Sequence, residues 1–114
     1  MGYDEHFQAA LAALPCPVSK EPASGDAETY AVFNEAQGSF TGYASNGPHR
    51  LRHMVQVHIY SRRDDGTHEA LLGQAMRLLR VAGVRVYHFG PDLYEADTGY
   101  HHIAATCVWT ETTE

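Results

Sequence analysis

Cysteine is scarce in this chain, and its two cysteines lie far apart. Cys16 stands in a proline-flanked turn, and Cys107 stands in a segment with the pattern of a strand. Two cysteines leave no second pair for a zinc site or for a disulfide framework. We therefore expect two reduced thiols in a protein of the cytoplasm.

Signals for secretion and membrane insertion are missing as well. No apolar run approaches the ~20 residues that span a bilayer, and the first residues, MGYDEH, are acidic where a secretory signal is basic. Apolar residues make up 44% of the chain and charged residues 19%, so the composition is typical neither of a disordered nor of a membrane protein. We expect a soluble protein with no membrane contact.

Positively charged residues are also few. Eight Lys and Arg residues against fourteen Asp and Glu residues give a formal net charge of −6, which opposes binding of a phosphate backbone by the whole surface. The arginines gather in residues 50–63 and 77–85. This grouping is typical of solvated element ends, and a phosphate site is the alternative.

Hydrophobic spacing predicts two helices and four strands. Residues 4–14 and 67–82 carry apolar residues at helical spacing, and residues 29–33, 51–60, 84–89 and 100–110 are β-branched, aromatic or alternating. Residues 19–27 and 91–99 are expected to be exposed connections. The sequence thus predicts one α+β domain over residues 1–114, in the order α-β-β-α-β-β, with two β-hairpins in a mainly antiparallel sheet packed on the amphipathic second helix.

The strand at residues 51–60 has the clearest alternation. Leu51, His53, Val55, Val57 and Ile59 share one face, which is aliphatic enough to lie on a core. The opposite face is mixed, as expected for a sheet that is partly covered or open to solvent or to another subunit. In the last strand, residues 101, 103, 105, 107 and 109 share one face and residues 100, 102, 104, 106 and 108 the other.

Aromatic residues gather in the connections. Residues 34–49 contain Phe40 and Tyr43 among three glycines, and this stretch is either an extended hairpin or a functional loop. Tyr87, Phe89, Tyr94 and Tyr100 surround the other long connection. Aromatic residues on connections are frequent in protein–protein contacts, and their folding back over the domain's own core is the alternative.

Eight histidines raise the hypothesis of a metal site. His101 and His102 are sequence neighbours, so on a strand they point to opposite faces and cannot share one ion, and the same parity separates His53 from His58. A trio of His58, His88 and one of the adjacent pair could converge across strands. Because no HExxH, HxH or Cys/His pattern supports such a trio, we expect no metal and no cofactor.

The other candidate catalytic residues do not form a recognisable active site in the sequence either. Asp64, Asp65, Asp92, Glu95 and Asp97 lie in turns, where carboxylates are usually helix caps or solvated loop residues. Cys107 lies in the segment AATCVW, which favours a small buried hydrophobe over a nucleophile. The glycines are not followed by the Lys-Ser or Lys-Thr pair of a phosphate-binding loop. The sequence therefore favours a protein that is not an enzyme.

The second half of the chain has a recognisable order of elements. A strand at Gln56–Ser61 leads through an acidic turn to an amphipathic helix, within Asp64–Ala82, and then to Gly90-Pro91-Asp92 and the segment DTGYHH at Asp97–His102. In residue pattern and in the order of these elements, residues 55–109 resemble the C-terminal half of the tail terminator or tail-completion proteins of long-tailed bacteriophages and prophages. About half of the chain is covered.

The resemblance implies a structural virion protein of the tail or neck, assembled in the cytoplasm of a bacterial host. It implies a ring of identical subunits, commonly a hexamer, that ends the tail tube, joins it to the head connector and lets DNA pass as cargo. Its partners would be further copies of the chain, the tail tube protein and the head–tail connector protein. We expect subunit or partner contacts at Phe40, Tyr43, Tyr60, Arg62, Arg63, Phe89, Tyr94 and Tyr100.

Three alternatives stay open at this point. A head–tail connector or stopper protein differs only in its partner. A small metal-dependent hydrolase or nuclease would use the histidines, with His58 and His102 as the residues to test. A small-molecule-binding α+β module would have a closed apolar pocket within the monomer.

Overall fold

The computed structural model describes residues 2–21, 27–41 and 49–113. Their elements follow one another as α1 (Tyr3–Ala10), β1 (Val18–Lys20), β2 (Thr29–Thr41), β3 (His49–Ser61), α2 (Thr67–Val81), β4 (Arg85–Phe89), β5 (Leu93–Glu95) and β6 (Tyr100–Thr113). The fold class is confirmed in outline, as two helices and one mixed sheet. The predicted order α-β-β-α-β-β is wrong in detail, because it lacks β1 and β5.

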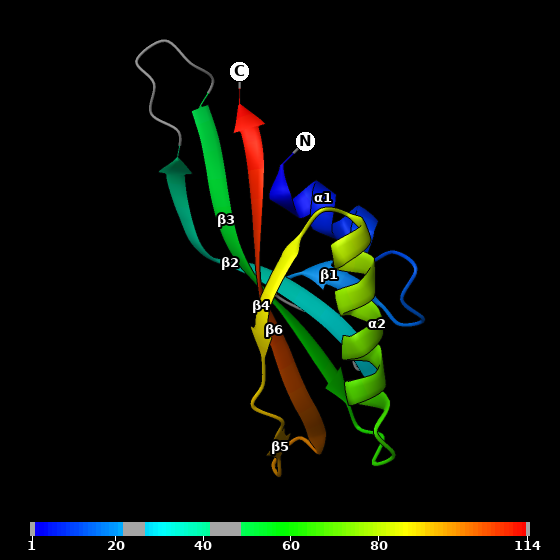
Figure 1. Ribbon diagram of the computed structural model, residues 1–114. Coiled ribbons are helices and arrows are strands. Elements are labelled where there is room, and N and C mark those ends of the chain that lie inside the picture. The colour runs from blue at the N-terminus through cyan, green and yellow to red at the C-terminus, as the bar shows by residue number, and fades with distance from the viewer. Residues whose placement is uncertain (1, 22–26, 42–48, 114) are drawn as a thin grey trace.

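The sheet has the order β1-β2-β3-β6-β4, and β5 pairs with the start of β6. β1 is parallel to β2, and the other pairings are antiparallel. Both helices lie on the same side of the sheet (Figure 1). The other side is left without a helical layer among the described residues, and we call it the open face.

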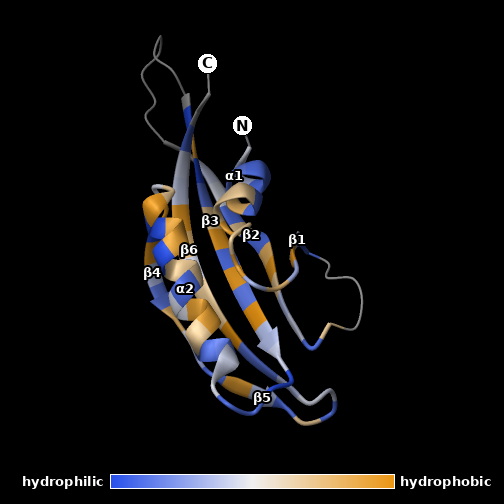
Figure 2. Cartoon of the chain, turned by 90° about the vertical axis from the view of Figure 1, so that its right-hand side faces the viewer, coloured by the Kyte–Doolittle hydropathy of each residue, from blue (hydrophilic) through white to orange (hydrophobic). Residues whose placement is uncertain are grey.

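The core forms between the helices and the covered face of the sheet. Most of its buried residues come from both helices, the residue after α1, and the three strands β2, β3 and β6: Phe7, Leu11, Ala31, Phe33, Val55, Val57, Ile59, Leu71, Leu72, Ala75, Leu79, Ile103, Ala105 and Cys107. Figure 2 shows the alternation of hydrophobic and hydrophilic residues along β3 that places its apolar face here. The predicted core face of β3 is therefore confirmed, as is the burial of Cys107, which raises the pKa of its thiol to about 12.

The first helix is shorter than predicted. α1 ends at Ala10, although Leu11 and Leu14 are still buried in the core. Pro15 disfavours helical geometry at the residue before it, and the chain must turn there to enter β1, where Val18 pairs with Ala31. The helical spacing therefore correctly indicated that Leu11 and Leu14 are buried, although both lie beyond the end of α1.

β2 is much longer than the predicted strand at residues 29–33. It continues to Thr41, in register with β3, after an irregularity between Glu35 and Gln37. The stretch 34–49 is therefore an extended hairpin as far as it is described. With the end of β6 this hairpin forms an arm that projects beyond the helices (Figure 1), and the longest axis of the molecule is 53 Å.

The second predicted hairpin also differs. β4 pairs with β6 as expected, but the connection between them contains β5, which pairs with residues 100–102 and turns tightly at Gly99. Gly99 has a positive φ of 78°, a conformation that glycine adopts without steric cost.

None of the described helices is long and apolar enough to cross a membrane.

Candidate interaction surfaces

A row of stacked rings crosses the open face of the sheet. Tyr30, Tyr60 and His102 are register partners on β2, β3 and β6. The rings of Tyr30 and Tyr60 stack with centroids 4.8 Å apart, and those of Tyr60 and His102 stack at 4.2 Å. The ring of Tyr100 meets both tyrosines edge-on. We call these four residues the aromatic row.

Two predicted contact residues besides Tyr60 belong to this region. The guanidinium of Arg62 lies 4.4 Å from the centroid of the Tyr100 ring, which is cation–π distance. The Tyr100 side chain is buried, and its hydroxyl donates a hydrogen bond to the carbonyl of Ala27. Tyr60, Arg62 and Tyr100 are thus brought together, with Tyr100 engaged within the chain itself.

A second surface lies at the β4 edge of the sheet. The aromatic and aliphatic side chains of Tyr87, Phe89, Leu93 and Tyr94 are between 47% and 61% exposed, from β4 and β5. Because neighbouring residues of a strand point to opposite faces, Leu93 and Tyr94 border this edge from the two sides of the sheet. We call the four residues the edge patch. It contains two of the predicted contact residues, Phe89 and Tyr94, and the edge strand β4 has no strand on its outer side in the described sheet.

The remaining predicted contact residues lie elsewhere. Arg63 donates two hydrogen bonds from its guanidinium to Asp65, and these bonds hold the pKa of the Asp65 carboxyl well below its usual range. Asp65 also accepts a hydrogen bond from the backbone N–H of Thr67 at the start of α2. Phe40 is in β2 but its side chain lies outside the described residues, as does Tyr43 entirely.

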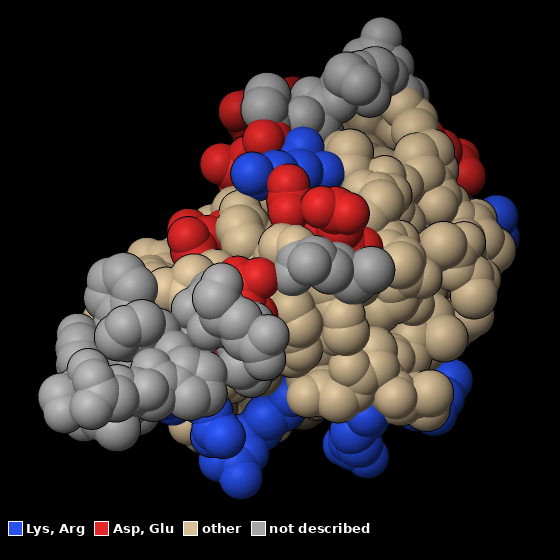
Figure 3. All heavy atoms as spheres, turned by 90° about the horizontal axis from the view of Figure 1, so that it is seen from above, with Lys and Arg blue, Asp and Glu red and all other residues tan. Residues whose placement is uncertain are grey.

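A third surface is a groove beside α1, at the opposite edge of the sheet from β4. It has a volume of about 560 Å³ and is lined by Asp4, Glu5, Gln8, Ala9, Ala12, Lys20 and Phe33. We call it the α1 groove. Figure 3 shows that acidic side chains gather in one area of the molecule, while most basic side chains project from the opposite edge of the same view.

The histidines separate by face as the parity argument predicts. His58 and His102 meet on the open face, where Nδ1 of His58 lies 2.9 Å from Nε2 of His102 and Nε2 of His58 lies 2.9 Å from Oδ1 of Asn34. His53 lies on the covered face between Glu35 and Glu111. The suggested trio with His88 does not come together. Within the described residues the metal-type cluster is His68, Asp92 and His101.

His68 is the residue that the sequence analysis overlooked. A signal for it existed, because residue 68 precedes Leu71, Leu72, Ala75 and Leu79 at helical spacing and so falls on the buried stripe of α2. A histidine on such a stripe needs polar partners, which here come from distant parts of the chain. No local motif could name those partners.

The histidine pair on the open face predicts acid sensitivity. Burial lowers the pKa of both His58 and His102 below the usual 6.5, and the charge of His102 lowers that of His58 further. The unfolded chain then binds protons more readily below pH 6.5, so this pair costs stability as the pH falls. We expect His58→Gln to flatten the fall of unfolding free energy between pH 6.5 and 5, by at most about 1.4 kcal/mol per pH unit.

Urea unfolding at several pH values measures this slope. His88→Gln, in an exposed histidine of β4, is the control and should keep the wild-type slope. An unchanged slope in His58→Gln would show that His58 is not held neutral by its surroundings.

The fold of this chain is found again in a solved structure. A chain of the structure titled "Virion of native gene transfer agent (GTA) particle" is similar to it with a TM-score of 0.56 and 12% sequence identity, over 93% of this chain and 84% of that chain. At this identity the likeness concerns the fold. No curated protein sequence matches the chain.

The sequence itself gives the more specific result. The model of the family described as "Tail completion protein gp17" matches residues 7–111, which is nearly the whole chain. The protein therefore belongs to the tail completion protein gp17 family. This membership confirms the resemblance seen in residues 55–109, extends it through the first half of the chain, and supports a structural role in a phage tail.

Proposed function

We propose that this protein is a non-enzymatic tail-terminator subunit, which forms a closed ring with copies of itself, as a hexamer, at the end of the tail tube. The ring joins the tail to the head connector and lets DNA pass through its lumen. The family match over residues 7–111 carries this proposal. The contacts below support it from the geometry.

A cyclic ring needs two different surfaces on each subunit that fit one another. The edge patch and the α1 groove lie at opposite edges of the sheet, next to β4 and β1 respectively. One surface presents exposed aromatic side chains, and the other is a largely apolar hollow. We infer that the edge patch of one subunit docks in the α1 groove of the next.

Charge supports the same pairing. Asp4 and Glu5 line the α1 groove, whereas Arg80 lines a shallow hollow with Tyr87 and Phe89 of the edge patch. Opposite charges at the rim of an interface steer association and fix its orientation. The pairing therefore brings Arg80 toward Glu5 and Asp4, of which Asp4 also pairs with Lys20 within the groove.

Light scattering during size-exclusion chromatography, over a concentration series, tests ring formation. We expect the wild-type chain to reach a mass of six times 12.6 kDa. Phe89→Asp removes an exposed aromatic anchor, whose loss costs about 2 kcal/mol in a docked interface, so the dissociation constant should rise at least ~30-fold. A wild-type protein that stays monomeric at every concentration and does not bind tail tubes would contradict the proposal.

Two controls make this test specific. Val81→Asp changes a side chain that is 89% exposed but lies outside the edge patch, and it should leave the mass distribution unchanged. The single reversals Arg80→Glu and Glu5→Arg should each weaken association, and the double variant should recover part of the loss. If the double variant is as weak as the sum of the singles, the two surfaces do not meet.

The particle that the ring binds distinguishes a tail terminator from a connector or stopper protein. Purified ring should co-sediment with assembled tail tubes and occupy one end of each tube in electron micrographs. Binding to connector particles alone, without tail tubes, would favour the connector or stopper function instead.

A further inference from the structure

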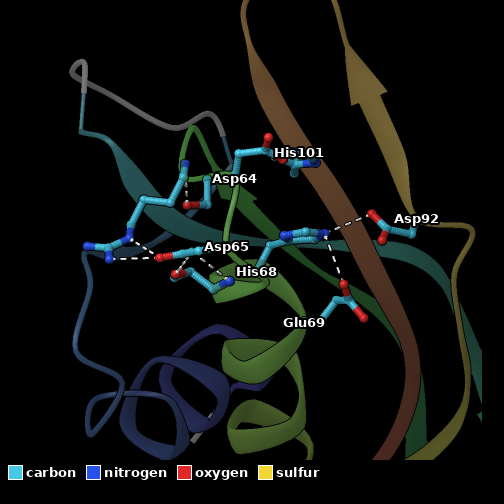
Figure 4. Close-up of polar contacts among 9 residues, drawn as sticks. Asp64, Asp65, His68, Glu69, Asp92 and His101 are labelled. Carbon is cyan, nitrogen blue, oxygen red and sulfur yellow. Dashed lines mark hydrogen bonds and ion pairs between the residues drawn. The ribbon is translucent and has the colours of Figure 1, made fainter.

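One cluster of metal-ligating side chains lies outside the surfaces described above. His68 comes from the first turn of α2, His101 from the start of β6, and Asp92 from the connection between β4 and β5. One donor atom of each residue lies within 4.8 Å of the donor atoms of the other two. Figure 4 shows the His68 ring pointing from α2 toward Asp92, with His101 beside it.

The contacts within the cluster are close. Nε2 of His68 lies 2.9 Å from Oδ1 of Asp92 and 3.9 Å from Oε1 of Glu69. The rings of His68 and His101 stack with centroids 4.7 Å apart. Asp64 accepts a hydrogen bond from Nε2 of His101 at 3.1 Å. Two imidazoles and one carboxylate thus converge on one small volume, and the Glu69 and Asp64 carboxylates each lie next to one of the imidazoles.

The burial of His68 is only partly compensated, because Asp92 contacts one of its two ring nitrogens. Its side chain is 4% exposed, and its Nδ1 has no hydrogen-bond partner within the described residues. A buried polar group without a partner costs free energy that an apolar side chain would avoid. The stripe of leucines that follows it on α2 shows that an apolar residue would suit the position.

The donor set selects the type of ion. Imidazole nitrogen with one or two carboxylates suits zinc and its neighbours in the transition series, whereas magnesium and calcium prefer oxygen ligands alone. A zinc ion brings its ligand atoms to about 2.0–2.2 Å from itself. The half-exposed Asp92 can move to close this distance, while the buried His68 is fixed.

We propose that His68, Asp92 and His101 bind one zinc-type divalent cation, which fastens the β4–β5 connection to the start of α2. Asp64 lies in the position of an outer carboxylate that orients a metal-bound imidazole. Leu93 and Tyr94 directly follow Asp92, so the ion also fixes half of the edge patch. The role of the ion is structural, and binding does not depend on ring formation.

Calorimetric titration of the chelator-treated full chain with ZnCl₂ tests the proposal. We expect one zinc ion per chain and a melting temperature that rises with zinc concentration, because a ligand of the native state stabilises it by mass action. MgCl₂ should give no such effect at the same concentrations. Cobalt(II) should give a visible absorption band that zinc displaces.

Variants of the two less buried ligands avoid the risk of misfolding at His68. His101→Gln and Asp92→Asn should each lower zinc affinity at least ~10-fold, and Asp64→Asn should lower it about 10-fold as an outer-sphere change. His102→Gln is the matched control, because His102 has the same 18% side-chain exposure as His101 and points to the opposite face. It should bind zinc as the wild type does.

Three results would overturn the proposal. They are the absence of zinc binding below about 100 μM, which is weak for a site of this composition, wild-type affinity in both His101→Gln and Asp92→Asn, and loss of binding in His102→Gln instead. A chain that binds zinc as described but forms no ring would leave the site intact and contradict only the proposed function.

Discussion

Replacement of Phe7 by Ala is expected to lower the free energy of unfolding by about 3–5 kcal/mol. The Phe7 side chain is fully buried and packs against Phe33 of β2, with ring centroids 5.9 Å apart. Its removal leaves a cavity between α1 and the sheet. The free energy of unfolding of a domain of this size is only about 5–15 kcal/mol. The Phe7 side chain would therefore account for a large share of it.

Urea or thermal unfolding measures this loss, and a conservative control defines its cause. Phe7→Leu keeps most of the volume and should cost less than half as much. Gln8→Ala, next to it on the exposed side of α1, removes one hydrogen bond to the carbonyl of Val18 and should cost about 1 kcal/mol. Equal losses in Phe7→Ala and Phe7→Leu would mean that the volume of the ring does not decide the docking of α1.

His53→Leu is expected to lower the free energy of unfolding by about 3 kcal/mol, at the low end of the range for removing one partner of a buried ion pair, since His53 is buried but Glu35 is partly exposed. The His53 ring lies between two carboxylates, with Nδ1 bonded to Glu35 and Nε2 2.7 Å from Oε1 of Glu111. It also packs beside Tyr3 and Trp109. Its loss leaves two neighbouring carboxylates without a cation at the base of the arm.

The pH dependence of this loss has a definite sign. Burial by itself lowers the pKa of His53, but the hydrogen bonds and charges of Glu35 and Glu111 outweigh it, so the pKa is raised above the usual 6.5. A raised pKa in the folded state gives stability that is fully present below pH 6.5 and is lost as the pH rises through the folded value. The difference between wild type and His53→Leu should therefore be larger at pH 6 than at pH 9.

A triple variant separates the charge from the packing. His53→Leu combined with Glu35→Gln and Glu111→Gln leaves no carboxylate unpaired, so it should recover much of the loss. If it is as unstable as His53→Leu alone, the packing of the imidazole between Tyr3 and Trp109 matters more than the ion pairs. A difference that grows with pH would contradict a protonated His53.

The parts of the fold that sequence reasoning found are those with a strong local period. β3 and α2 were placed within about two residues, because Val55, Val57 and Ile59 alternate and Leu71, Leu72, Ala75 and Leu79 recur at helical spacing. Both elements bury one face on the core. When an element buries one face, its apolar residues recur along the sequence with the period of that element.

The missed parts have no such period. Residues 34–41 of β2 belong to the arm, where exposed residues such as Glu35, Gln37 and Ser39 give no apolar face to recognise. β1 and β5 have three residues each and form because a partner strand is already in place. Their existence depends on contacts with distant residues, which a local pattern does not contain.

The interaction surfaces were predicted in part. Phe89 and Tyr94 lie on the edge patch and Tyr60 in the aromatic row, and their position beside turns is the local signal that singles them out. Whether these residues contact another molecule remains a prediction. The groove beside α1 and the His68 cluster are formed by segments far apart in the sequence, so no spacing rule indicated either of them.

The pairing of β3 with β6 gives the molecule a mechanical axis. Their register runs without interruption from His49 and Thr113 in the arm to Ser61 and His101 at the far end. In an antiparallel pair the hydrogen bonds lie perpendicular to the strands, so a pull along the strands loads all of them in shear at once. A pull that peels away the three-residue β1 would instead break its bonds one after another. Tension between the arm and the opposite end is therefore carried by the strongest part of the sheet.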